Sequence, residues 1–358
     1  MPAPRRRSVL LAGAAAAAVT ALPGTGSAAA DEPRRRPRGP LVIGHRGAAG
    51  WRPEHTVASY THAVQTGADW IEPDLVPTKD HVLVVRHENE ISGTTDVARH
   101  SEFASRRTTK TVDGRSVTGW FTEDFTLAEL KTLRAVERLP LVRNRNTVFD
   151  GRLEVMTFQE VVDLGRKLSK RYGRTIAVFP ETKHPTYFRS IGLPLEPALV
   201  EVVRRNRLRP DECVVQSFEP SSLTRIAEAR LRLPLWQALG TTGGPYGHPA
   251  TYKEMMTPAG LGRIAEYADW IGPDKSSVVA PSPLLADAHA AGLKVGAYTF
   301  RCENQFLPAQ FRRGTAPNEF GDAFAEYALH YGMGVDAVVT DFPDLAVIAR
   351  DAAAAAWS

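Results

Sequence analysis

Eight short apolar segments recur between residues 41 and 341, and most of them are followed or preceded by a pattern typical of an amphipathic helix. The segments cover residues 41–45, 69–74, 175–181, 213–217, 233–238, 269–272, 294–299 and 336–341. The clearest helical patterns cover residues 195–205, 220–230, 281–291 and 319–331. Short buried strands that alternate with helices favour a parallel sheet, and eight of them favour its closure into a barrel. The sequence therefore predicts an α/β protein with a TIM-type (β/α)8 barrel over residues 41–350.

Two segments after the second strand are surplus to the barrel. The first, 76–87, contains the turn-forming sequence TKDH, so we expect a hairpin over the barrel mouth that returns His87 to the level of Glu72. His81, in this turn, is assigned no catalytic role. The second, about 88–155, is rich in arginine, threonine and charge. A long insertion at the catalytic face is usually a lid or a specificity element, and a mobile surface loop is the alternative.

The formal net charge of +4 comes from the N-terminal end of the 358-residue chain. Residues 1–38 hold seven arginines against Asp31 and Glu32, which leaves 37 basic and 38 acidic side chains in the remainder. The body of the protein is thus nearly neutral, and we expect no nucleic-acid partner.

The leader has the order of regions typical of a cleavable export signal. Arg5–Arg7 precede an apolar stretch from Val9, and small residues, Ala28 and Ala30, stand before Asp31. We expect a signal peptide at 1–30 that uses the twin-arginine route, a polar linker at 31–40 and a secreted protein; a disordered arginine-rich tail is the alternative. The leader is too weakly apolar to span a membrane and has no nearby cysteine for a lipid, so no stable membrane anchor is expected. The oligomeric state is not predicted.

Chemically versatile side chains gather where the first strands end. His45 and Arg46 close the first apolar segment, Glu72 and Asp74 close the second, and His87 closes the surplus hairpin. Carboxylates one residue apart on a strand point the same way and suit a hard cation. Imidazoles titrate near neutral pH and serve as general acids and bases, and a guanidinium matches a phosphate. Together these groups indicate cleavage of a phosphate ester.

An ordered series of motifs gives the chain a family resemblance over nearly all of its length beyond the leader. The motifs are HRGAAGWRPEHT at 45–56, EPDLVPTKD at 72–80, VVRH at 84–87, FPETK at 179–183, YADWIGPD at 267–274, VGAYTFR at 295–301 and VVTDFPDLAV at 338–347. In these the chain resembles the glycerophosphodiester phosphodiesterase family, and most of all its exported bacterial branch. The resemblance implies a TIM-type barrel, a divalent cation, and hydrolysis of a small-molecule glycerophosphodiester to glycerol 3-phosphate and an alcohol.

The resemblance also implies roles for charged residues. Glu181 matches the third metal ligand beside Glu72 and Asp74, and a site of three carboxylates suits Ca²⁺, or else Mg²⁺, better than zinc. Arg46 and Lys183 match the basic residues that hold the phosphate. A purely structural pairing of Lys183 with Glu181 is the alternative.

His45 and His87 are the expected acid–base pair, because each ends a strand within a matching motif. His55, in PEHT, is assigned no role. Glu54, in the same motif, is expected to open a helix and to orient Arg46.

Aromatic residues at strand ends are candidates for the walls of the substrate pocket. They are Phe218 after the fourth strand and Tyr298 or Phe300 at the end of the seventh, with a plug of the core as the alternative. Asp341 is left out of the catalytic residues, because it is suitably placed to cap a helix from Leu345 onward.

Several functional alternatives stay open. A phospholipase D-like diesterase would use the same barrel, and a non-catalytic module would bind phosphate-bearing lipid or cell-wall material. It is undecided whether the enzyme also acts on glycerophosphate polymers. It is equally undecided whether the nucleophile is water or a hydroxyl of the substrate. A glycosidase is disfavoured because it needs neither the His-Arg pair nor a third acid.

Two cysteines, Cys213 and Cys302, are predicted to be free thiols. Cys213 begins the fourth strand, and Cys302 follows the seventh, at the other face of the barrel. A strand of this length separates the faces by roughly 17–20 Å, whereas the Cα atoms of a disulfide lie within about 7 Å.

Overall fold

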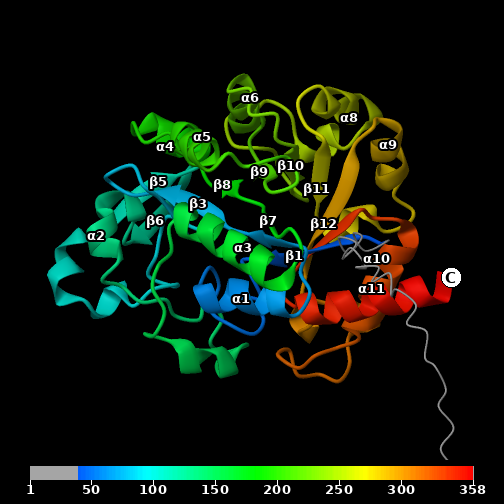
Figure 1. Ribbon diagram of the computed structural model, residues 1–358, viewed down its shortest axis with the longest axis horizontal. Coiled ribbons are helices and arrows are strands. Elements are labelled where there is room, and N and C mark those ends of the chain that lie inside the picture. Colours follow the sequence, from blue (N-terminus) through cyan, green and yellow to red (C-terminus); the bar gives the residue numbers. More distant parts are fainter. Residues whose placement is uncertain (1–38, 358) are drawn as a thin grey trace, which may run out of the picture. The chain divides into compact units, whose positions relative to one another are not determined.

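The structure is a computed structural model that describes residues 39–357. The predicted signal peptide and most of the linker lie outside these residues and stay predictions. The main sheet has the strand order β4-β3-β8-β9-β10-β11-β12-β13-β1-β2-β7 (Figure 1). Its strands are β1 (Leu41–His45), β2 (Trp70–Glu72), β3 (Asp74–Pro77), β4 (Leu83–Val85), β7 (Ala177–Val178), β8 (Glu181–Thr182), β9 (Val215–Ser217), β10 (Leu235–Leu239), β11 (Trp270–Pro273), β12 (Lys294–Phe300) and β13 (Ala337–Thr340).

The sheet closes into a barrel of eight parallel strands. β2 and β3 are halves of one strand, interrupted at Pro73, and β7 and β8 are halves of another. Backbone bonds of 2.9 Å, from Phe179 N to Ile71 O and from Glu181 N to Pro73 O, continue the pairing across both interruptions. Each of the eight expected strands is therefore found, and the TIM-type fold is confirmed.

Helices cover the outside of the strands (Figure 1). The α-helices are α1 (Val57–Gln65), α2 (Leu127–Leu130), α3 (Phe158–Tyr172), α4 (Pro185–Ser190), α5 (Leu195–Asn206), α6 (Pro220–Glu228), α7 (Tyr252–Met255), α8 (Pro258–Ala265), α9 (Leu284–Ala290), α10 (Ala323–Met333) and α11 (Pro343–Trp357). The 3₁₀ turns are η1 (Val97–Arg99), η2 (Ser101–Arg106), η3 (Thr122–Asp124), η4 (Asn144–Phe149), η5 (Lys275–Val278), η6 (Asn304–Phe306) and η7 (Ala309–Phe311). The four expected helices are α5, α6, α9 and α10. The last begins later than expected, because Asp322 caps it by accepting a bond from Ala325 N.

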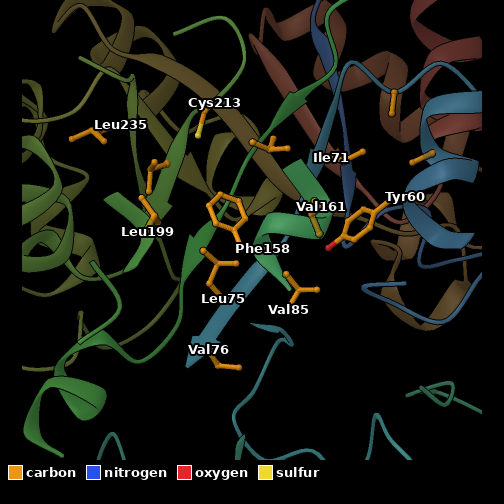
Figure 2. Packing of buried hydrophobic residues seen from close by; sticks show 14 of the residues in the cluster. Tyr60, Ile71, Leu75, Val76, Val85, Phe158, Val161, Leu199, Cys213 and Leu235 are labelled. Atoms are coloured by element: carbon orange, nitrogen blue, oxygen red, sulfur yellow. The ribbon is translucent and has the colours of Figure 1, made fainter. Parts of the chain in front are cut away.

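α3 shows how the sequence shapes one of these helices. Thr157 and Glu160 form a reciprocal capping box at its start, and Gly173 ends it in the left-handed conformation with φ +61°. Its buried face includes Phe158 and Val161, which pack in the cluster that also holds residues of the second barrel strand and of β4 (Figure 2). This apolar layer fixes the outer side of the strands that carry the site.

The barrel interior has its own apolar cluster. It consists of Ile43, Phe179, Val214, Trp236, Trp270, Ala337 and Val339. The Trp236 and Trp270 rings stack with centroids 4.9 Å apart. A Cβ at Gly272 or Gly296 would lie 2.0 or 1.8 Å from the Trp236 indole, so only glycine fits beside that ring.

The surplus hairpin forms as expected. β3 and β4 pair antiparallel, and Arg86 N donates to Asp74 O at 3.0 Å, which returns His87 to the carboxylates. His81 is exposed in the turn with φ +63°, a conformation that favours glycine.

The insertion has secondary structure of its own. Its main feature is a hairpin of β5 (Thr108–Val112) and β6 (Arg115–Gly119), joined by a tight turn at Asp113 and Gly114, both at positive φ. This hairpin was not predicted, although Asp-Gly between strand-forming residues is a signal for it.

Cys213 and Cys302 are buried and are not joined by a disulfide, which agrees with the prediction. Among the described residues, no helix is long and apolar enough to cross a membrane.

Candidate active site

Three buried carboxylates lie together at the carboxyl end of the barrel. Strand pairing sets Asp74 opposite Glu181 and places Glu72 opposite His45. One oxygen from each of the three carboxylates lies within 4.8 Å of the others. The structure therefore brings together the three predicted ligands.

The electrostatics of this cluster fit a cation. Burial, together with the charges of Asp74 and Glu181, raises the pKa of Glu72 well above its usual value. Burial likewise raises the pKa of Glu181 to about 7. Burial opposes ionisation of Asp74 too, but Lys183 and a bond from His55 hold its pKa well below the usual value. The three oxygen donors lie close together, and the surrounding groups do not neutralise all of their negative charge. Such a set of donors suits a hard divalent ion.

Neighbouring groups fix the orientation of these carboxylates. The backbone N of Arg46 donates to Glu72 Oε2 at 2.7 Å, and His55 Nε2 lies 3.0 Å from Asp74 Oδ2. His55 is fully buried, and its Nδ1 lies 2.8 Å from Tyr60 Oη. His55 was predicted to have no role, but the structure shows that it positions Asp74.

His45 is held by a residue far away in the sequence. Its Nδ1 lies 2.5 Å from Asp341 Oδ1, and Asp341 Oδ2 accepts from Arg143 Nη2 at 2.6 Å and from Arg301 Nε at 2.9 Å. The helix-cap interpretation of Asp341 is therefore wrong, because both oxygens of the carboxylate bind side chains. Burial and the nearby Arg46 lower the pKa of His45 to about 4, so the ring is neutral and an Nδ1–H bond to Asp341 leaves Nε2 as the basic nitrogen.

His87 contacts groups of opposite charge on its two nitrogens. Its Nδ1 lies 2.8 Å from Glu88 Oε1, and its Nε2 lies 3.4 Å from Lys183 Nζ. Burial, with Arg46 and Lys183, lowers the pKa of His87 to about 3. Both predicted acid–base histidines thus line the same cavity as the carboxylates.

The predicted phosphate-binding cations border this cavity as well. Arg46 Nη1 donates to Glu54 Oε2 at 3.0 Å, which agrees with the expected orienting role of Glu54. Glu54 itself precedes helix α1, whose N-cap is Thr56, so it does not open the helix. Lys183 Nζ lies 2.9 Å from Glu181 Oε1, as the structural alternative expects, and also faces the cavity.

The site is hollowed into two adjoining cavities. The first, of about 410 Å³, is lined by the three carboxylates, by His45 and His87 and by Arg46 and Lys183. Phe218, Tyr298 and Arg138 from the insertion line it as well. The second, of about 560 Å³, shares only Glu181, Lys183 and Phe218 with the first.

Residues of the insertion line both cavities. Hairpin residues Val112, Asp113, Arg115 and Val117 border the second cavity.

Of the predicted aromatic pocket residues, Phe300 is buried in the core, where it stacks on Tyr327 with centroids 5.2 Å apart. Tyr298, not Phe300, is therefore the pocket residue of that strand.

Fold and site together define a parallel α/β-barrel hydrolase built for phosphate esters. The model of the glycerophosphoryl diester phosphodiesterase family matches residues 45–345, and the chain belongs to this family. A glycerophosphodiester phosphodiesterase of Arabidopsis thaliana is 34% identical, over 94% of this chain and 92% of that protein. One of Haemophilus influenzae is 28% identical, over 86% and 88%. The chain is an enzyme of this type.

Solved structures share the fold. A putative glycerophosphoryl diester phosphodiesterase from Silicibacter pomeroyi is 23% identical, with a TM-score of 0.63 over 88% of this chain and 94% of that one. A phosphodiesterase from Oleispira antarctica, in complex with the product sn-glycerol-3-phosphate, is 20% identical, with a TM-score of 0.58 over 87% and 96%.

Proposed function

We propose that this enzyme hydrolyses glycerophosphodiesters to glycerol 3-phosphate and an alcohol, with a divalent cation at Glu72, Asp74 and Glu181. The observation that carries the proposal is the convergence of three carboxylates, two imidazoles and two cations on one cavity. The bound cation would supply charge compensation for the phosphate. Ca²⁺ is the first choice and Mg²⁺ the second, because all three donors are carboxylate oxygens.

His45 and His87 divide the proton transfers. His45 Nε2, with its ring oriented by Asp341, takes the proton of the attacking hydroxyl, which is water or the neighbouring glycerol hydroxyl. As the new P–O bond forms and the bond to the alcohol breaks, His87 gives a proton to the alcohol oxygen. The negative charge of the bound phosphate favours the protonated form of His87. Arg46 and Lys183 hold the non-bridging oxygens.

The assay of this proposal follows both products. Purified protein with Ca²⁺ or Mg²⁺ should release glycerol 3-phosphate and free alcohol from glycerophosphodiesters. His45→Ala and His87→Ala should each lower the rate about 10²-fold or more, as is usual for acid–base groups. Release of a phosphorylated alcohol with free glycerol would contradict the proposed bond cleavage, as would full activity of either variant.

We also propose export of the enzyme through its N-terminal leader. The support is the order of charged, apolar and small residues at 1–30. Mass spectrometry of protein recovered from the culture medium should give a chain that begins near Asp31, and an intact N-terminus on protein retained in the cytoplasm would contradict export.

A further inference from the structure

The second cavity has no part in the chemistry described above, yet it adjoins the phosphate site. A phosphodiester carries two alcohol arms, one on either side of the phosphate, and two cavities meet at the residues proposed to hold the phosphate. Lys183 lies on the border of both cavities. His87 bonds to Glu88, which lines the second cavity and not the first. The alcohol that receives the proton of His87 is therefore best accommodated in the second cavity.

Glu219 is one of the buried acidic residues that line this cavity. The residue lies just before helix α6 and is 4% exposed. Its Oε2 accepts from Thr186 N at 3.1 Å and from Thr186 Oγ1 at 2.5 Å. Among the described residues, no cationic side chain forms an ion pair with it. Burial raises the pKa of Glu219 to about 7, and the bonds from Thr186 and the charge of His184 offset this effect only in part.

The basic groups around the cavity are mostly committed elsewhere. His184 bonds to Asp113 Oδ2 at 2.6 Å and to Glu88 Oε2 at 2.9 Å. Lys183 pairs with Glu181 and is assigned to the phosphate. Arg115 lines the cavity from the exposed hairpin and forms no ion pair with Glu219. An excess of negative charge therefore remains at Glu219.

Aromatic rings complete the wall. Phe218 packs edge-on against Tyr252, with centroids 6.3 Å apart, and Tyr246 lines the same cavity beside the hairpin turn. Aromatic faces next to an uncompensated carboxylate attract organic cations, and quaternary ammonium groups in particular.

We propose, on the basis of the function proposed above, that the second cavity binds the leaving alcohol and selects alcohols that carry an ammonium group. Glu219 supplies the countercharge, and Tyr252 and Tyr246 supply the faces. The enzyme should therefore prefer glycerophosphocholine and glycerophosphoethanolamine to diesters of the neutral alcohols glycerol and inositol.

The experiment measures kcat/KM for glycerophosphocholine and for glycerophosphoglycerol, and takes their ratio. Glu219→Gln removes the charge and keeps the shape, and it should lower this ratio about tenfold, within the range of a lost charge contact and weakened cation–π binding. Glu228→Gln, at the exposed far end of the same helix, is the matched control and should leave the ratio unchanged.

A second measurement keeps the proposal testable if Glu219→Gln does not fold. Choline should inhibit the wild-type enzyme at least about tenfold more strongly than 3,3-dimethyl-1-butanol, its neutral isostere. An unchanged ratio in folded Glu219→Gln, or equal inhibition by the two alcohols, would overturn the ammonium site while hydrolysis persists. Absence of hydrolysis of every diester by the wild type would instead overturn the proposed function.

Discussion

The contact between His45 and Asp341 is the residue-scale feature on which the proposed chemistry most depends. Asp341 fixes which imidazole nitrogen carries the proton, and Arg143 and Arg301 fix Asp341 in turn. A base held in one tautomer presents its lone pair to the nucleophile at no further cost in orientation.

Asp341→Asn should lower kcat about 10²-fold or more, because the amide no longer enforces the Nδ1–H tautomer of His45. Steady-state kinetics with a saturating diester measures this effect, and circular dichroism separates it from unfolding. Asp351→Asn, which changes an exposed carboxylate beside Arg350, is the control and should retain kcat within about twofold. Retention of wild-type kcat by Asp341→Asn would mean that His45 needs no such partner.

Residues of the site differ in how far the sequence could identify them. Glu72 and Asp74 lie at the end of an apolar strand. Their proximity could be predicted because alternate side chains of a strand point the same way and because buried carboxylates need a partner. Asp341 lies 296 residues from His45, and no local pattern announces that contact. His55 was missed because a histidine in a loop has no distinguishing periodicity.

At the scale of elements, the insertion hairpin is tied to the barrel by one histidine. His184, just before α4, bonds to Asp113 in the β5–β6 turn and to Glu88, which also bonds to His87. The hairpin and His87 are thus linked through a short polar chain.

This link should make stability depend on pH. Although burial opposes it, the bonds to Asp113 and Glu88 raise the pKa of His184 to about 9, from an ordinary value near 6.5. Because the pKa of His184 is higher in the folded state than in the unfolded state, its pairing stabilises the folded protein fully below about pH 6.5. This contribution to stability is lost as the pH rises through about 9. Urea denaturation should therefore show His184→Gln less stable than wild type by roughly 1–3 kcal/mol at pH 6, with a smaller difference at pH 9.5. A difference that grows with pH would contradict the pairing.

The element-scale prediction from sequence was good for the barrel strands and poor for the insertion. The strands have continuous apolar runs, because parallel barrel strands are buried on both sides. The β5–β6 hairpin is mostly exposed, with Val112 its clearest buried residue, so its alternation carried little signal.

At the scale of the whole molecule, the barrel interior limits which residues can change. Trp236 fills the space that Gly272 and Gly296 leave open. The sequence identified these strands, but not this packing, because a glycine in a strand does not reveal which distant ring approaches it.

Gly272→Ala should lower the free energy of unfolding by about 1–3 kcal/mol or more, since the added methyl group overlaps the indole in a close-packed interior. Thermal or urea denaturation measures the change. Gly262→Ala, in α8 with open space around its Cα, is the control and should be neutral or slightly stabilising. Equal stability of Gly272→Ala and wild type would show that the interior can repack.

The central claim is that hydrolysis requires a divalent cation held by Glu72, Asp74 and Glu181. The direct measurement is the rate of glycerol 3-phosphate release by chelator-stripped protein, before and after titration with Ca²⁺ and then Mg²⁺. We predict no turnover when the protein is stripped, saturable recovery on addition of the ion, and no recovery in Asp74→Ala at the same ion concentrations. Full activity of the stripped wild-type protein would contradict the claim.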